Sequence, residues 1–116
     1  HASATLAQSL DKMGYHPYTF AIFGAMADKD IDGVLKPMMD LVDYWYCTDL
    51  LTARAAKASD LAKQIRLLGK EAEVFSGAGS AYQMALDKAG EGDRIVVFGS
   101  FYTVAGVMAY RNNQAH

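Results

Sequence analysis

The chain has 116 residues with a formal net charge of −2, and its apolar fraction of 52% is that of a globular rather than a disordered protein. This length suffices for one domain, not two, and the charge gives no reason to expect nucleic acid or an acidic membrane surface as a partner. The longest apolar stretch, residues 18–27, is too short to span a bilayer. We expect a cytoplasmic protein in which the single cysteine, Cys47, is buried and reduced.

Segments with apolar residues at helical spacing alternate with short continuous apolar runs. The predicted elements, in chain order, are a helix at residues 3–13, a strand at 18–23, a helix at 31–42, a strand at 44–48, a helix at 59–68, a strand at 72–75, a helix at 80–89, a strand at 95–98 and a helix from 101 onward. This order predicts a single α/β domain over residues 1–116. The expected architecture is a Rossmann-like three-layer sandwich with a mainly parallel four-stranded sheet and helices on both faces.

The chain begins at His1 without an initiator methionine, and its first predicted element is a helix. Doubly wound domains usually begin with a strand, so we expect these residues to be part of a longer protein.

Capping residues and apolar spacing predict the ends and the buried faces of the helices. The residues expected at helix ends are Gly14, Ser59, Gly69 and the capping-box pair Ser80 and Gln83, whereas Pro37 is expected to weaken the second helix. The residues expected to face inward include Leu6, Leu10 and Met13 in the first helix, Leu61, Ile65 and Leu68 in the third, and Phe101, Val104, Ala105 and Met108 in the last.

The most informative segment is the apolar run 95–98, which predicts a strand buried on both faces, followed at once by Gly99 and Ser100. The last helix begins directly after this turn. Ser100 and the first free N–H groups of that helix therefore meet at the carboxyl end of the strand. Unpaired N–H groups and the helix dipole favour negative charge, so this position suits a carboxylate or a phosphate.

Polar groups follow all four predicted strands at the edge where open α/β sheets bind ligands. These groups are Asp28-Lys29-Asp30 after the first strand, Thr48-Asp49 and then Arg54 after the second, residues 76–80 after the third, and Gly99-Ser100 after the fourth. The loops at the opposite edge resemble ordinary solvent-exposed connections. We expect any site to lie at the first edge.

Several motif matches at this edge are incomplete. Residues 28–33 reproduce the first half of a calcium-binding loop, but Met39 occupies the position of the bidentate glutamate, so Asp30 or Asp32 is expected to cap a helix instead. Gly77 and Gly79 are expected to form a tight turn rather than a dinucleotide site. The sequence contains no P-loop, no set of residues with metal-ligand spacing and no nucleophile elbow, so no metal site and no self-sufficient catalytic group is predicted.

Four segments together resemble the bifunctional dihydrofolate synthase/folylpolyglutamate synthase family. Residues 98–104, Phe-Gly-Ser-Phe-Tyr-Thr-Val, are similar to its closing motif, and residues 26–30 to its M-x-D-K-D segment. Residues 43–48 with Arg54-Ala55 resemble its D-x-W-Y strand and the P-R-A that follows, although Ala53 replaces the proline. His1-Ala2 resembles the residues directly after its D-x-A-H-N-P motif.

The resemblance implies that the chain is the C-terminal domain of a Mur-ligase-like, ATP-dependent amide ligase. In such enzymes the N-terminal domain, absent here, carries the P-loop, binds ATP and Mg²⁺ and performs most of the ATP chemistry. The implied reaction activates a pteroate or folyl carboxylate as an acyl phosphate, which the amine of L-glutamate then attacks. The C-terminal domain would help to bind glutamate and close the cleft against its own N-terminal ATPase domain, so the isolated chain is expected to be inactive.

The resemblance also implies site residues. Ser100, Tyr102 and Thr103 are the expected contacts to a glutamate carboxylate or to the cleft, and Asp28, Lys29 and Arg54 the expected cleft or interdomain contacts. Two alternatives stay open: a stand-alone small-ligand-binding or regulatory α/β module, and a flavodoxin- or receiver-like domain that would use aspartates such as Asp28, Asp30 and Asp49.

Overall fold

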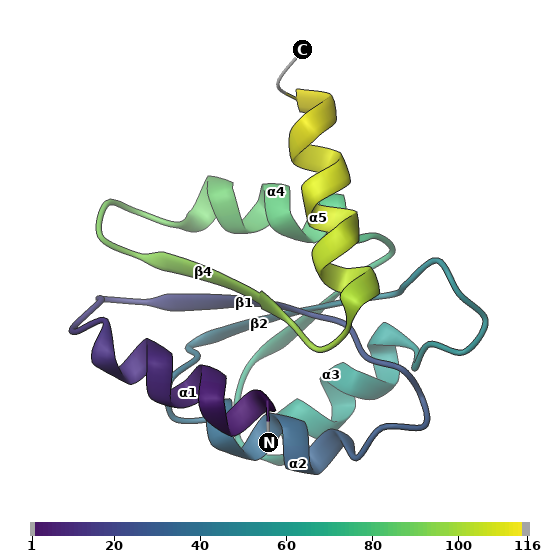
Figure 1. The fold of residues 1–116 in the computed structure, drawn as a ribbon, viewed down its shortest axis with the longest axis horizontal. Coiled ribbons are helices and arrows are strands. Elements are labelled where there is room, and N and C mark those ends of the chain that lie inside the picture. The colour runs from purple at the N-terminus through teal and green to yellow at the C-terminus, as the bar shows by residue number, and fades with distance from the viewer. Residues whose placement is uncertain (1, 115–116) are drawn as a thin grey trace.

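A four-stranded parallel sheet lies between two layers of helices in the computed structural model, which describes residues 2–114 (Figure 1). The elements are α1 (Ala2–Lys12), β1 (Thr19–Phe23), α2 (Ile31–Leu35), a 3₁₀ turn (Lys36–Met38), β2 (Tyr44–Thr48), α3 (Ala58–Leu67), β3 (Ala72–Phe75), α4 (Ala78–Lys88), β4 (Arg94–Phe98) and α5 (Phe101–Gln114). This order confirms the predicted α/β fold class. His1, on which part of the resemblance rests, lies outside the described residues.

The strands are ordered β3-β2-β1-β4, and every neighbouring pair is parallel. The chain therefore moves outward from β1 through β2 to β3 and returns by α4 to β4 on the other side of β1. The carboxyl ends of β1 and β4 are therefore neighbours, at the point where the order in which strands are added to the sheet reverses. This is the position at which open α/β sheets generally bind ligands.

Each face of the sheet has its own core. On the lower face in Figure 1, α1, α2 and α3 cover a cluster in which the rings of Phe23, Trp45 and Phe98 lie 5.1–5.8 Å apart. On the upper face, small side chains of α4, including Ala81 and Ala85, pack on Phe20, Ile22 and Tyr46. Burial of both clusters holds the three layers together.

Arg94 hydrogen-bonds α1 to the sheet. Arg94 Nε donates to Thr19 Oγ1 at 2.6 Å, and its Nη1 donates to the carbonyl of Leu10 at 2.9 Å, near the end of α1. A cation that pairs the last carbonyls of a helix also complements its dipole. Gly14, with φ of 88°, follows the helix as predicted.

Two predicted helix caps are wrong. Ser59 lies inside α3, and the amide of Ala58 instead donates to Asp49 Oδ1 at 2.8 Å, from a loop that begins nine residues earlier. α4 begins at Ala78, so Ser80 is already helical and its hydroxyl donates to Gly77 O rather than opening a capping box. Pro37 acts as expected, because α2 ends at Leu35 and continues only as a 3₁₀ turn.

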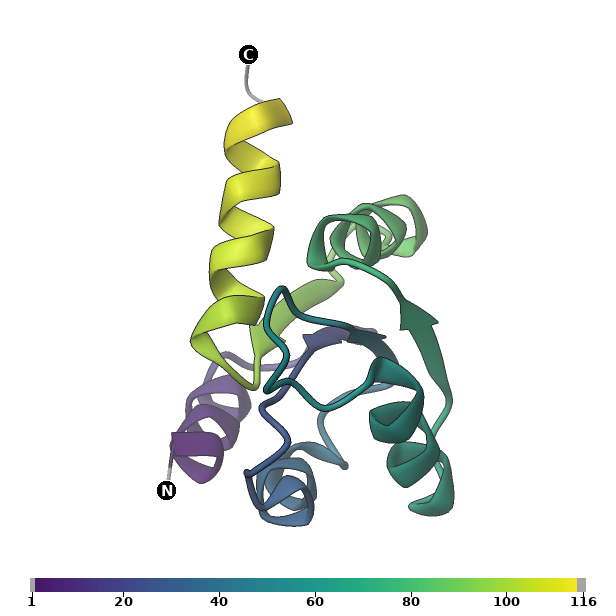
Figure 2. The ribbon, with the colours of Figure 1, turned by 90° about the vertical axis from the view of Figure 1, so that its right-hand side faces the viewer.

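The predicted buried faces are partly wrong. Met13 and Leu68 are exposed, and in α5 the buried residues are Thr103 and Val107, whereas Phe101, Val104 and Met108 are exposed. The physical reason is that α5 packs on α4 and touches the sheet mainly near its first turn, then projects away from it (Figures 1 and 2). Gly106 faces Ala78 at this helix crossing, where an added Cβ would lie 3.0 Å from the alanine Cβ.

The strand predicted to be buried on both faces is an edge strand. β4 pairs only with β1 among the described residues, and Ile95 and Val97 are half-buried, whereas Val96 and Phe98 are buried in the lower core. The tight turn predicted at Gly77 and Gly79 is also only partly found. Gly79 lies within α4, where its missing side chain makes room for Tyr110. Within residues 2–114, the length and hydropathy of the helices rule out a membrane-spanning helix.

Cys47 is buried in the lower core, as expected, and burial raises the pKa of its thiol to about 12 from 9.0. The folded state then holds a proton that the unfolded chain loses at alkaline pH. We expect the free energy of unfolding to fall, by up to about 1.4 kcal/mol per pH unit from this group, as pH rises from about 9 to 12. Urea unfolding at a series of pH values measures the slope. The Cys47→Ala variant is the control and should lack this part of it; an unchanged slope would contradict the prediction.

Candidate functional site

Four loops meet at the carboxyl edge of the sheet, which faces the viewer in Figure 2. The loops after β1 and β2 are joined by a short antiparallel bridge between Met26 and Ala55. Ala27 N donates to Arg54 O and Ala56 N donates to Ala25 O, both at 2.9 Å. Backbone hydrogen bonds therefore hold two loops, far apart in the sequence, as one unit.

The carboxyl ends of β1 and β4 touch through two glycines. A Cβ on Gly99 would lie 2.1 Å from Gly24 O, and the φ of Gly99 is 114°, a conformation that residues with a side chain rarely adopt. Thr103 lies above this contact, where its buried Oγ1 donates to Gly24 O at 2.9 Å. The turn after β4 and the first turn of α5 are thereby fixed against the end of β1.

Ser100 begins α5. Its Oγ accepts the amide of Thr103 at 3.3 Å and lies 3.2 Å from Thr103 Oγ1, so it is a helix cap, as the sequence indicated. The amides of Phe101 and Tyr102 have no acceptor within the part of the chain that the structure describes. Two free N–H groups at the start of a 14-residue helix are suited to an anion.

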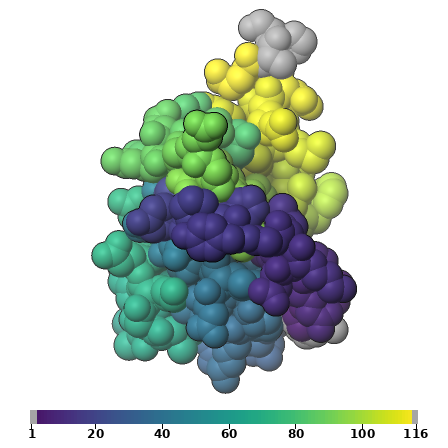
Figure 3. Space-filling view, turned by 90° about the vertical axis from the view of Figure 1, so that its left-hand side faces the viewer, coloured from purple at the N-terminus to yellow at the C-terminus, as the bar shows by residue number. Residues whose placement is uncertain are grey.

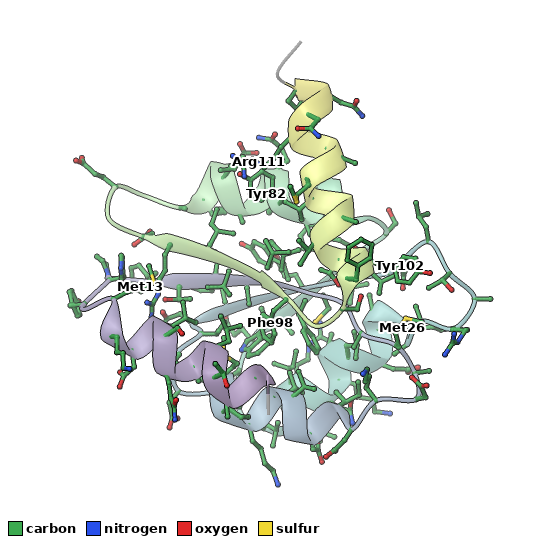
Figure 4. The ribbon with its side chains drawn as sticks, in the orientation of Figure 1. Met13, Met26, Tyr82, Phe98, Tyr102 and Arg111 are labelled. Atoms are coloured by element: carbon green, nitrogen blue, oxygen red, sulfur yellow. The ribbon has the colours of Figure 1, made fainter. Side chains whose placement is uncertain are left out.

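Tyr102, another of the predicted contacts, lies on the first turn of α5 at the carboxyl edge (Figure 4). About half of its side chain is exposed. Met26 lies at the same edge, in the loop after β1. Of the three predicted contacts on α5, Ser100 and Tyr102 are accessible and Thr103 is buried, so Thr103 positions the helix start instead of reaching solvent.

The three predicted contacts from the other loops also lie at this edge. Arg54 Nη2 lies 3.7 Å from Asp28 Oδ2, and both side chains are more than two-thirds exposed, so this ion pair contributes little to stability. Lys29 lines a hollow of about 340 Å³ with Asp30, Phe98, Gly99 and α1 residues. We call this the carboxyl-edge hollow. It lies beside the contact between Gly24 and Gly99, and Lys29 is the positively charged residue of its lining.

Two acidic residues at this edge have structural roles. Asp30 Oδ1 accepts the amide of Gly33 at 3.2 Å and caps α2, which selects Asp30 over Asp32 for the role expected of one of them. Asp49 caps α3 through Ala58. Within residues 2–114 no three His, Cys, Asp or Glu side chains are grouped as a metal site would require.

Sequence reasoning missed Gly24 and placed Asp49 at this edge without its capping role. Gly24 directly follows β1, and a glycine at the end of a central strand is itself a signal of close backbone approach. The cap that Asp49 provides gave no signal, because the capped amide is nine residues away across a loop whose path the sequence does not specify.

Comparison with known proteins gives the fold its family. The family described as "Mur ligase, glutamate ligase domain" matches residues 1–101, most of the chain. The chain belongs to this family. Its membership agrees with the open α/β sheet described above.

Relatives of known name are similar over nearly the whole domain. It is 31% identical to the dihydrofolate synthase/folylpolyglutamate synthase of Buchnera aphidicola (subsp. Schizaphis graminum) over 98% of the chain and 27% of that protein. E. coli FolC, solved in complex with DHPP and ADP, superposes on all of the chain and 27% of its own with a TM-score of 0.93 at 30% identity. A bifunctional folylpolyglutamate synthase/dihydrofolate synthase solved with Mn, AMPPNP and L-glutamate bound has a TM-score of 0.85 at 36% identity, over 97% of this chain and 26% of its own. The glutamate ligase domain therefore spans about a quarter of the length of these relatives.

The contact between Gly24 and Gly99 predicts a large effect of one methyl group. We expect Gly99→Ala to lower the free energy of unfolding by about 3 kcal/mol or more, because the positive φ adds strain and the new Cβ overlaps Gly24 O. Gly14→Ala is the matched control. Its φ of 88° is also positive but nothing lies within 4 Å, so a loss of about 1 kcal/mol is expected. Equal losses in urea unfolding would show that φ alone matters.

Proposed function

We propose that residues 1–116 are the C-terminal domain of a larger folate-type, ATP-dependent carboxylate–amine ligase. It would add L-glutamate to dihydropteroate, to folylpolyglutamate or to both. The observation that carries the proposal is the match of almost the whole chain to synthases of this name, together with an anion-suited helix start at the sheet's carboxyl edge. The buried free thiol of Cys47 is compatible with a cytoplasmic location.

In the proposed reaction the substrate carboxylate is activated as an acyl phosphate. The glutamate amine attacks the acyl carbon, the new amide bond forms, and inorganic phosphate leaves. ATP, held with Mg²⁺ mainly by the N-terminal domain, supplies the phosphoryl group. The residues described here fit that division, since no P-loop occurs in the chain and no acidic cluster suited to a metal occurs within residues 2–114.

The domain's own part is to bind and orient glutamate. The free amides of Phe101 and Tyr102 lie at the carboxyl edge, where a glutamate carboxylate would receive their hydrogen bonds and the favourable end of the α5 dipole. Ser100 Oγ–H, which donates to Thr103 Oγ1 in this structure, would turn to the carboxylate when glutamate binds. Thr103 keeps this group in place through Gly24. Positioning of the amine, rather than proton transfer by this chain, is then its contribution to the rate.

The exposed pair Asp28–Arg54 and Lys29 belong to the surface that would face the N-terminal domain. Their side chains lie at the same edge as Ser100, and the bridged loops hold Asp28 and Arg54 as a unit. Closure of the two domains would bring this surface over the nucleotide cleft and exclude water from the reacting groups.

In the full-length enzyme we expect Ser100→Ala to raise KM for glutamate by about tenfold or more, because a hydrogen bond to a charged group is worth about 1.5–3 kcal/mol. KM for MgATP should change little. Ser9→Ala, an exposed serine of α1, is the control. Steady-state kinetics with each substrate varied separately measures both constants. An unchanged KM for glutamate would remove Ser100 from the binding site.

The isolated 116-residue chain is expected to fold and to catalyse no ligation, since it lacks a P-loop. Incubation with ATP, Mg²⁺, L-glutamate and dihydropteroate, followed by mass spectrometry of the products, tests this. Glutamylated product formed by the purified chain would contradict the assignment of ATP chemistry to a separate domain.

A further inference from the structure

The sheet has a second hollow at the opposite edge, where the amino ends of the strands lie. Its volume is about 810 Å³. Figure 3 looks onto this edge, where the purple chain leading into β1 runs between the green α4–β4 connection above and the teal α3–β3 connection below. We call it the amino-edge hollow. It shares no lining residue with the carboxyl-edge hollow, so an inference about it does not rest on the proposed ligase function.

Aromatic rings line this hollow. Tyr44 stacks on Phe20 with ring centroids 5.0 Å apart, and the ring of Tyr18, half-exposed, lies 5.7 Å from Tyr44. Tyr46, two residues after Tyr44 in β2 and on the same face, has its ring centroid 6.0 Å from that of Phe20. These rings offer a flat apolar surface of the kind on which another ring stacks, and concave sites of this volume with aromatic lining are typical of small-molecule binding.

Tyr46 provides a polar group inside the hollow. Its side chain is 95% buried, yet no residue that the structure describes pairs with its hydroxyl. Trp45 Nε1 is the sole buried unpaired side-chain polar atom within residues 2–114, so the Tyr46 hydroxyl must reach open space. Burial and the nearby Glu73 carboxylate raise the pKa of Tyr46, so the hydroxyl keeps its proton and can donate.

The rim carries charges of both signs. The Asp93 carboxylate already accepts hydrogen bonds from the amides of Tyr18 and Gly90. The Arg66 guanidinium donates to Ala72 O. The charged side chains of the lining that form no ion pair or hydrogen bond in the described chain are those of Lys70, Glu71, Glu73 and Lys88. Two cations and two carboxylates without side-chain partners thus surround an aromatic floor, beside the charges of Arg66 and Asp93.

We propose that the amino-edge hollow binds a small aromatic molecule that carries both an ammonium and a carboxylate group, that is, an aromatic amino acid or a compound of the same chemistry. The ring would stack on Tyr44 and Tyr18. Its ammonium would pair with a rim carboxylate, Glu73 being the one beside Tyr46, and its carboxylate with Lys70 or Lys88. A purely anionic or purely cationic ring would meet one pair of like charges, so the mixed rim favours the zwitterion.

Three probes with the same phenyl ring separate these cases: L-phenylalanine, phenylacetate and 2-phenylethylamine. Titration of the ¹⁵N-labelled chain, followed by amide NMR shifts, measures both affinity and place. We expect L-phenylalanine to bind severalfold more tightly than either singly charged probe, with shifts at residues 44–46 and 70–73 and none at Lys29 or Ser100. Equal binding of the three probes, shifts at the carboxyl edge, or no binding at all would overturn the proposal.

Variants test which side chains bind the ring and the charged groups of the probe. Tyr44→Ala should abolish binding, and because it removes packing, its fold is checked by the dispersion of the amide spectrum. Glu73→Gln, an exposed and structurally neutral change, should reduce L-phenylalanine affinity severalfold while leaving phenylacetate binding equal or stronger. Lys29→Gln at the other edge is the matched control and should change neither. If Glu73→Gln leaves the preference for the zwitterion intact, the charge argument fails.

Discussion

The carboxyl edge depends on one close approach, between the backbones at the ends of β1 and β4. Gly24 O lies where a side chain on Gly99 would be, and the same carbonyl accepts the hydroxyl of Thr103. This carbonyl therefore joins the central strand, the turn after the edge strand and the first turn of α5. The orientation of α5, and with it the direction of its two free amides, follows from a contact that only glycine allows.

Much of the fold could be read from the sequence because its signals are local. The alternation of apolar runs with helical spacings predicted β2 and β3 with the bounds that the structure has. Gly99-Ser100 predicted the junction of β4 with α5. Errors arose where a residue acts at a distance. Asp49 displaced Ser59 as the cap of α3, and α4 rather than the sheet selected the buried face of α5, so that Thr103 and Val107 replaced Phe101 and Met108 inside.

The sequence predicts at which edge of the sheet the candidate site lies, but not how its side chains are arranged. Strand order determines that the loops after β1, β2 and β4 share an edge, so Asp28, Lys29, Arg54 and Ser100 had to lie near one another. Sequence could not show that Thr103 faces inward, since threonine on a first helical turn serves equally as a ligand or as an anchor. Nor could it show that the opposite edge is hollow, because Tyr18, Tyr44 and Glu73 come from three segments whose meeting depends on the sheet register.

The bridge between the loops after β1 and β2 constrains how such domains can change over time. Ala25 pairs with Ala56 and Ala27 with Arg54, so each loop supplies the other's backbone partners. An insertion in one loop would leave amides or carbonyls of the other unpaired unless its partner also changed. Lengths of these two loops should therefore vary together among relatives, although more than twenty residues of chain, about a helix and a strand, separate them.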